Sequence, residues 1–169
     1  MVIGPGGAGK TTLARRLAAV TGLPLTHLDQ LYWRPGWQPT PDPEWREVVR
    51  RLVAGDAWIL DGNYGGTLGL RLAACDTAVF LDVPRGICLA RVIARRLRHR
   101  DRSRPELPVG CPERLSLEFM VWIWTFPRRR RGEVLKRLAA LRGGQRSIVL
   151  RTDRQMEAFL AAQARLSPA

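Results

Sequence analysis

Residues 1–18 read MVIGPGGAGKTTLARRLA, and they place an apolar strand, a glycine-rich turn and a helix next to one another. The turn matches the pattern G-x-x-x-x-G-K-[ST]. Its fixed positions hold Gly4, Gly9, Lys10 and Thr11, and the small residues between them are Pro5, Gly6, Gly7 and Ala8. Behind the turn, Leu13, Leu17 and Val20 recur at helical spacing. The stretch therefore predicts a strand–loop–helix unit, with the helix running from about Gly9 to Val20.

A loop of this composition is suited to holding phosphate. Small residues let successive N–H groups turn inward and form a concave anion nest, and the helix adds its unpaired N–H groups and the positive end of its dipole. We expect Lys10 to reach the β- and γ-phosphates and the Thr11 hydroxyl to bind Mg²⁺. The other phosphate contacts are expected from Gly4, Gly6, Gly7, Ala8, Gly9 and Thr12. No N-K-x-D stretch specifies guanine, so the expected cofactors are ATP and Mg²⁺.

The first strand is short. A central buried strand normally has about five or six residues, yet only Met1 to Ile3 precede Gly4. Either the strand itself is short, or the true start codon lies upstream.

Length and composition limit the function classes. A chain of 169 residues with 46% apolar residues predicts one soluble domain over residues 1–169. The longest apolar run, Phe119–Phe126, is far shorter than the about 20 residues that span a bilayer, so no membrane partner is expected. Three cysteines without CxxC spacing indicate neither a disulfide framework nor a zinc site, and the expected location is a reducing cytoplasm.

The charge is open to three interpretations. The net charge is +13, and 26 of the 28 basic residues are arginines. Such a surplus is typical of nucleic-acid binding. It is equally what a GC-rich genome produces, or what an enzyme that grips phosphate with planar guanidinium groups requires.

Five short apolar segments are expected to be strands: Met1–Ile3, Leu25–Leu28, Trp58–Leu60, Thr77–Leu81 and Ser147–Leu150. Helical patterns separate them, and this alternation predicts an α/β fold with a parallel sheet. Further helices are expected from Pro41 with Thr40 as N-cap, from Pro112 to about Phe126 with an interruption at Pro127, and from Thr152, which forms a capping box with Gln155.

Two polar segments are candidates for binding substrate. Residues 29–54 form a proline-rich excursion after the second strand, in which Trp33 and Trp37 are placed to stack on a ring. The helix after Pro84 carries a stripe of Arg91, Arg95, Arg98 and Arg102. Residues 97–112 are too charged to pack and predict a mobile lid that closes over phosphates.

The third and fourth strands bring in a family resemblance. Residues 58–96, WILDGNYGGTLGLRLAACDTAVFLDVPRGICLARVIARR, resemble the middle of adenylate kinases and related small P-loop kinases. The matching positions are Asp61-Gly62, Leu81–Pro84, and the pair Arg91 and Arg95. The segments HLDQLYWRPGW, DGNY and GCPER are more specifically similar to the subgroup often labelled DNA topology modulation protein. The resemblance covers essentially the whole chain. It implies a three-layer P-loop NTPase fold with a five-stranded parallel sheet in the order 2-3-1-4-5.

The resemblance also implies roles for individual residues. Asp61 would lie near Mg²⁺, through water, and Arg91 would flank the ATP base or phosphates. Arg95 and the lid residues Arg102 and Arg104 would neutralise the migrating phosphoryl group. Catalysis would then consist mainly of positioning and charge neutralisation.

The acceptor side departs from the family pattern. Adenylate kinases have D-G-F-P-R where this chain has Asp61-Gly62-Asn63-Tyr64, so the arginine that holds the acceptor phosphate is missing. The remaining candidates for acceptor binding are Arg34, Arg71 and Asn63. Asp29, at the end of the second strand, is either a general base for an acceptor hydroxyl or the cap of a turn. His27 is expected to be a packed core residue.

The sequence therefore supports two hypotheses. The first is an ATP-dependent phosphotransferase that acts on a nucleotide or another small acceptor. The second is a nucleotide-regulated nucleic-acid-binding protein that affects DNA topology, in which the net charge and the run Arg128–Arg131 contact phosphates.

Overall fold

The computed structural model describes residues 1–98, 107–112 and 115–166. Its strands are β1 (Val2–Ile3), β2 (Leu25–His27), β3 (Trp33–Arg34), β4 (Gln38–Pro39), β5 (Ile59–Asp61), β6 (Thr77–Leu81) and β7 (Arg146–Leu150). Its α-helices are α1 (Lys10–Thr21), α2 (Leu28–Tyr32), α3 (Asp42–Val53), α4 (Leu68–Ala74), α5 (Arg85–Arg98), α6 (Leu117–Arg129), α7 (Arg131–Ala139) and α8 (Asp153–Leu166). Two 3₁₀ turns, η1 (Pro35–Trp37) and η2 (Gly65–Thr67), complete the described elements.

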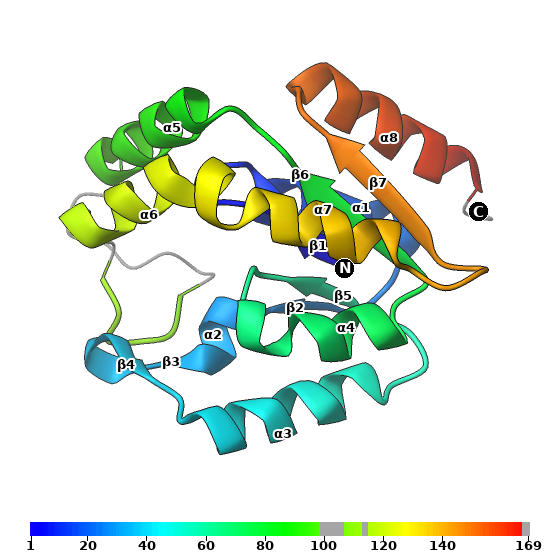
Figure 1. The fold of residues 1–169 in the computed structure, drawn as a ribbon, viewed down its shortest axis with the longest axis horizontal. Coiled ribbons are helices and arrows are strands. Elements are labelled where there is room, and N and C mark those ends of the chain that lie inside the picture. The colour runs from blue at the N-terminus through cyan, green and yellow to red at the C-terminus, as the bar shows by residue number, and fades with distance from the viewer. Residues whose placement is uncertain (99–106, 113–114, 167–169) are drawn as a thin grey trace.

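Five parallel strands form the central sheet in the order β2-β5-β1-β6-β7 (Figure 1). Strands β3 and β4 form a separate antiparallel hairpin. When the five strands of the central sheet alone are numbered along the chain, their order in the sheet is 2-3-1-4-5, as expected. In the register, Asp61 at the end of β5 lies opposite both Val2 of β1 and His27 of β2. The sheet thereby brings the ends of three strands next to the glycine-rich loop.

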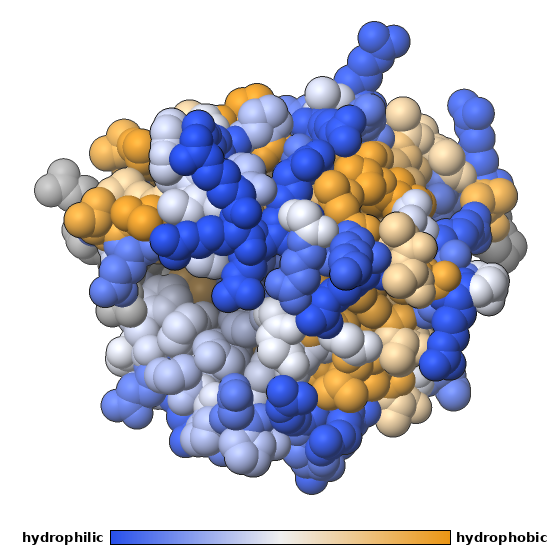
Figure 2. All heavy atoms as spheres, viewed as in Figure 1, coloured by the Kyte–Doolittle hydropathy of each residue, from blue (hydrophilic) through white to orange (hydrophobic). Residues whose placement is uncertain are grey.

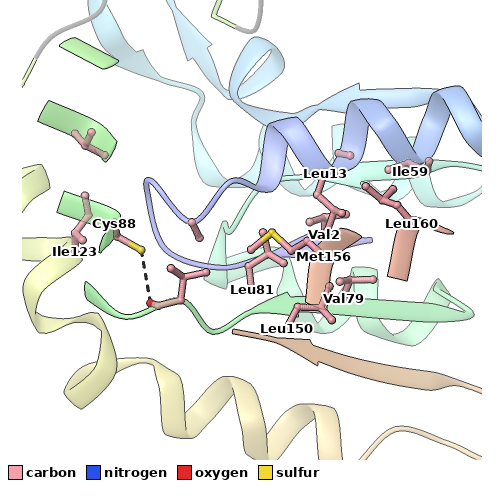
Figure 3. Packing of buried hydrophobic residues seen from close by; sticks show 14 residues of the cluster. Val2, Leu13, Ile59, Val79, Leu81, Cys88, Ile123, Leu150, Met156 and Leu160 are labelled. Carbon is pink, nitrogen blue, oxygen red and sulfur yellow. Dashed lines mark hydrogen bonds between the residues drawn. The ribbon is translucent and has the colours of Figure 1, made fainter. Parts of the chain in front are cut away.

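One face of the sheet is covered by α1 and α8, with α5 and α6 at the carboxyl end of the strands. Val2, Val79, Leu81 and Leu150 point to this side and meet Leu13 of α1 and Met156 of α8. Figure 3 shows Cys88 of α5 and Ile123 of α6 at the end of this cluster that lies beside the glycine-rich loop. The same cluster that holds the sheet together therefore also supports the loop.

The opposite face carries the alternate residues of the same strands. Ile3, Ala78 and Phe80 pack against α4, α6 and α7, and α7 lies in front of the sheet in Figure 1. Near the β2 edge, Leu28 and Leu60 pack against Trp45 and Val49 of α3. Helices on both faces of a parallel sheet make the three-layer α/β fold that was expected.

Several predicted boundaries were wrong. Helix α6 begins at Leu117 rather than near Pro112, because the Ser116 side chain caps it by accepting a hydrogen bond from the Phe119 N–H. The helix also continues through Pro127 to Arg129 and breaks only at Arg130. A proline has the φ of a helix but removes one hydrogen bond and crowds the carbonyl group four residues earlier, and the helix ends two residues after Pro127. Thr40 does not cap α3: its hydroxyl donates to the carbonyl groups of Leu31 and Tyr32.

The prediction missed the short elements. Helices α2, α4 and α7 and the β3–β4 hairpin are held in place by packing and by contacts with distant segments, and their own sequence patterns are too short to indicate them. The prediction that Thr152 caps the last helix is confirmed, since its hydroxyl accepts from the Gln155 N–H. The reciprocal bond of a capping box is shifted by one residue, because the Gln155 side chain accepts from the Arg151 N–H. Within the described ranges, every helix is too short or too polar to cross a membrane.

Candidate active site

The glycine-rich loop connects β1 to α1 at the carboxyl end of the sheet. Gly9 adopts a left-handed conformation with φ of 96° at the start of α1, which favours glycine. In the part of the chain that the structure describes, the N–H groups of Gly7, Gly9 and Lys10 donate to no protein acceptor. These donors form the anion-binding end of α1.

Two helices close against the outside of this loop. A Cβ atom on Gly7 would overlap the carbonyl group of Cys88 in α5, and a Cβ atom on Gly6 would overlap the Phe119 ring in α6. Burial raises the pKa of the Cys88 thiol, so the thiol stays neutral and adds no negative charge next to the loop. The glycines therefore serve the packing of α5 and α6 as well as the shape of the loop.

Lys10, Thr11 and Asp61 gather at the loop, as the sequence predicted. The Lys10 ammonium group donates to the Pro5 carbonyl oxygen at 3.0 Å and so lies over the loop. The Thr11 hydroxyl donates to Asp61 Oδ2 at 2.8 Å, and His27 Nδ1 lies 2.9 Å from the same oxygen. The other oxygen of the carboxylate, Asp61 Oδ1, is buried without a hydrogen-bond partner.

This arrangement fits a bound Mg²⁺ ion. A buried carboxylate oxygen without a donor is costly unless a cation or a polar group satisfies it. Mg²⁺ prefers oxygen ligands and keeps several of its waters, and Thr11 and Asp61 supply a hydroxyl and a carboxylate side by side. The residues present therefore match the metal that the sequence pattern implied.

Arg91 lies beside the glycine-rich loop, and Arg95 follows it on the same helix. The Arg91 side chain reaches within 3.8 Å of where a Cβ atom of Gly9 would stand, and it donates to both carboxylate oxygens of Asp153 at 2.8 and 2.7 Å. Asp153 begins α8, so the pair joins α5 to α8 next to the anion-binding end of α1. Arg95 is one turn further along α5 and partly buried. Thr12 is exposed in the first turn of α1.

The predicted lid can be followed only in part. Arg102 and Arg104 lie outside the described residues. Residues 107–112 pack onto the β3–β4 hairpin: the Gly36 N–H donates to the Gly110 carbonyl oxygen at 3.0 Å, and the Trp37 indole N–H donates to the Pro112 carbonyl oxygen at 3.2 Å. The end of the predicted lid therefore contacts the excursion over residues 29–54.

Asp29 lies in the first turn of α2, one residue beyond the start of that helix, rather than at the end of a strand. The Tyr64 hydroxyl donates to Asp29 Oδ1 at 2.5 Å. Burial, followed by the negative charge of Asp29, raises the pKa of Tyr64 well above its ordinary value, so the phenol stays protonated. In Figure 2 the surface is hollowed between α6 and the α2–β3 segment, with pale atoms of intermediate hydropathy lining the hollow.

The structure does not support acceptor binding by Arg71. This side chain is fully buried, and its guanidinium group donates to the carbonyl oxygens of Gly62, Asn63 and Tyr64, each at 2.9 Å. Burial lowers the pKa of Arg71 to about 10, which leaves it charged at neutral pH. Arg71 therefore braces the loop after β5.

The other two acceptor candidates, Arg34 and Asn63, stay predictions. Arg34 is half-exposed, and its guanidinium group pairs with Glu44 of α3 at 2.5 Å. Asn63 is partly buried in the loop after β5, between Asp61 and Tyr64.

Two residues at the site were missed. His27 was expected to be a core residue; it is buried, but it lies directly against Asp61. Parallel pairing of β2 with β5 could have suggested this contact, because both strands end at the same edge. Tyr64 carried no role in the family pattern, and no sequence signal linked it to Asp29, 35 positions away.

Comparisons with known proteins show which solved structures share this fold. A shikimate kinase from Acinetobacter baumannii, solved in complex with shikimate, is similar with a TM-score of 0.58 and 20% identity, covering 98% of this chain and 89% of its own. A sugar kinase from Janibacter sp. HTCC2649 is similar with a TM-score of 0.51 and 19% identity, covering 99% of this chain and 96% of its own. No protein-family model matches the chain.

Two curated proteins share sequence with a part of the chain. They are cytidylate kinases from two strains of Nitratidesulfovibrio vulgaris, each 37% identical over 67 residues, which is 38% of this chain. The matched part spans 29% of the length of these relatives. The resemblance to the topology modulation subgroup rests on sequence motifs alone. Taken with the loop and the sheet order, the structural likenesses show that this chain has the fold of the P-loop kinases.

Proposed function

We propose that the protein is an ATP-dependent phosphotransferase that transfers the γ-phosphoryl group of Mg·ATP directly to a small acceptor. The observation that carries the proposal is the pair Thr11–Asp61, with one buried carboxylate oxygen left unsatisfied beside the anion-binding end of α1. A phosphate loop alone would also suit a protein that only binds nucleotide. A metal-binding carboxylate beside the phosphate loop is a feature that phosphoryl transfer requires in addition.

In this proposal each residue has a defined task. The amides of Gly4 to Gly9 hold the phosphates, and Lys10 leaves the Pro5 carbonyl group to contact the β- and γ-phosphates. Thr11 and Asp61 would hold Mg²⁺, and the ion would neutralise charge on the phosphate oxygens. Arg91 flanks the nucleotide, and Arg95 neutralises the migrating group.

Asp29 is proposed as the acceptor-side carboxylate, and Asn63 as a second polar contact for the acceptor. A bond forms between the acceptor oxygen and the γ-phosphorus while the bond from that phosphorus to the bridging oxygen breaks. The hydroxyl proton passes to Asp29, and ADP leaves. The alternative role for Asp29, the cap of a turn, is disfavoured because the hydrogen bond that the described residues show for its carboxylate comes from the Tyr64 hydroxyl of a distant segment.

The experiment is a steady-state assay of ADP formation with Lys10→Ala against a matched control. Lys136→Ala is that control, because Lys136 is the other lysine of the chain and is exposed on α7. Removing one preorganised charge of this kind lowers kcat by about 10²–10³. We expect this loss for Lys10→Ala and none for Lys136→Ala. Equal activity of the two variants would contradict the proposal.

Nucleic-acid binding gains no support from the structure. Arg131 of the run Arg128–Arg131 is committed to Asp82 through two hydrogen bonds, and Arg130 lies 3.7 Å from Glu133. Arg131 is therefore already held in a contact within the protein, and the exposed Arg130 faces a carboxylate that Arg137 shares. Binding of duplex DNA that weakens steeply with salt and responds to ATP would restore this alternative.

A further inference from the structure

Side chains from three different elements meet at Asp61. His27 ends β2, Asp61 ends β5, and Thr11 lies in the first turn of α1. His27 and Asp61 stand opposite each other in the parallel pairing of β2 with β5. Residues paired in this way point to the same face of a sheet, so the register itself brings the imidazole ring to the carboxylate. Both residues are buried, at 9% and 5% exposure.

The two hydrogen bonds of this cluster go to the same carboxylate oxygen. The Thr11 hydroxyl donates to Asp61 Oδ2 at 2.8 Å, and His27 Nδ1 lies 2.9 Å from that oxygen. An ionised carboxylate only accepts hydrogen bonds, so the proton of the second contact belongs to Nδ1. Asp61 Oδ1 is buried, and the described residues give it no hydrogen-bond partner. The carboxylate is therefore held by one oxygen, while the other stays open.

Two donors on Oδ2 hold the carboxylate more firmly than one would. The terminal torsion of an aspartate side chain is broad, so a single hydrogen bond leaves the carboxylate free to turn. Here one donor comes from α1 and the other from β2, and turning the carboxylate breaks both bonds. Thr11 donates its only proton to Asp61, so its oxygen can offer lone pairs alone to a further partner. Thr11 Oγ1 and Asp61 Oδ1 are thereby left as oxygen ligands of the kind that Mg²⁺ prefers.

A histidine that served the core alone would be a costly choice at this position. Burying a polar ring has a free-energy cost that an apolar side chain avoids, unless the ring is hydrogen-bonded. The next residue, Leu28, is fully buried in an apolar cluster with Leu60 of β5. The neighbouring position 27 nevertheless carries an imidazole, and its bond to Asp61 offsets the cost of burial. The contact with Asp61 is therefore what favours histidine over leucine or valine here.

We propose that His27 is a positioning residue of the metal site: its Nδ1–H group holds Asp61 Oδ2, so that Asp61 Oδ1 and the Thr11 oxygen are presented to the Mg²⁺ ion of bound Mg·ATP. The inference rests on the proposed phosphotransferase function. It goes beyond that function because it assigns a role to a side chain that acts only through Asp61. Removing a partner that orients a metal-binding carboxylate lowers metal affinity by about 10–100-fold.

The test measures binding of a non-hydrolysable ATP analogue by calorimetry, once with Mg²⁺ and once with EDTA. The ratio of the two dissociation constants is the gain in affinity that Mg²⁺ provides. His27→Leu removes the donor, while His27→Asn keeps an N–H donor as many bonds from Cα as Nδ1 is. We expect His27→Leu to lower the gain about tenfold or more, and His27→Asn to keep it within about threefold of the parent value. The affinity measured in EDTA is expected to be the same in all three proteins.

Leu25→Ala is the packing control. Leu25 is partly buried on the same strand, and it is paired with Ile59, two positions before Asp61. This substitution weakens the packing of β2 without removing a hydrogen bond from the carboxylate, so we expect a lower Tm and an unchanged gain from Mg²⁺. A merely structural role for His27 predicts the same result for His27→Leu.

Several outcomes decide against the inference. An unchanged gain in His27→Leu overturns it, and so does a loss in His27→Asn as large as that in His27→Leu. If His27→Leu does not fold, His27→Gln takes its place, because it carries the same amide one bond further from Cα; a gain equal to that of His27→Asn then overturns the inference. A parent protein that binds the analogue without any gain from Mg²⁺ overturns it as well. Absence of binding by the parent protein refutes the proposed function instead.

Discussion

Replacing Arg71 by methionine separates two views of this residue. The sequence favoured an acceptor contact, which predicts a higher KM for the acceptor and normal stability. The structure places the guanidinium group on three backbone carbonyl oxygens at 2.9 Å, which predicts a loss of stability instead. Methionine fills most of the same volume, so the substitution removes mainly the charge and the three donors.

The magnitude follows from what the carbonyl groups lose. Among the described residues, Gly62 and Asn63 have no other donor to their carbonyl oxygens, while the Tyr64 carbonyl oxygen keeps the N–H and hydroxyl of Thr67. A buried acceptor left unpaired costs about 1–3 kcal/mol, and the partly buried Asn63 carbonyl group costs less than the buried one of Gly62. Removing a buried charge returns part of this sum. We expect a net loss of about 3 kcal/mol, or about 6–12 °C in Tm for a chain of this length.

The assay is chemical denaturation followed by fluorescence, with Arg34→Met as the matched control. Arg34 forms an exposed ion pair with Glu44, and such pairs contribute about 0–1 kcal/mol. A free energy of unfolding for Arg71→Met within about 1 kcal/mol of the parent protein, together with a raised KM for the acceptor, would refute the structural reasoning and restore the acceptor contact.

Two further predictions concern the same region. Asp61→Asn keeps an oxygen that can accept from Thr11 and removes the charge. We expect kcat to fall about 10²–10³-fold and the Mg²⁺ concentration needed for activity to rise, measured by titrating Mg²⁺ in the ADP assay. An unchanged Mg²⁺ dependence would exclude Asp61 from the metal site. Because the folded pKa of Tyr64 is raised above its unfolded value, the stability it supports is intact below about pH 10 and is lost as the pH rises further. Between pH 10 and 11 the parent protein should lose about 1 kcal/mol more than Tyr64→Phe in denaturant unfolding. Parallel losses would show that Tyr64 ionises freely in the folded state.

The nucleotide half of the site was predictable because its chemistry is local. Seven consecutive residues, Gly4 to Lys10, supply the loop, and the helix behind them follows from the spacing of Leu13 and Leu17. The order of the strands followed from the family resemblance, and it placed Asp61 at the correct edge. Parallel strands end at one edge of a sheet, so a linear pattern of strands is enough to bring Lys10, Thr11 and Asp61 together.

The acceptor half was decided by tertiary structure. Which way a guanidinium group turns depends on what lies within its reach, and for Arg71 that is a set of backbone carbonyl groups formed only when the loop after β5 folds over it. The pairing of Tyr64 with Asp29 likewise requires α2 and the loop after β5 to lie side by side. Side chains far apart in sequence become partners when the chain packs and buries them together. The spacing of residues along the chain does not specify that packing.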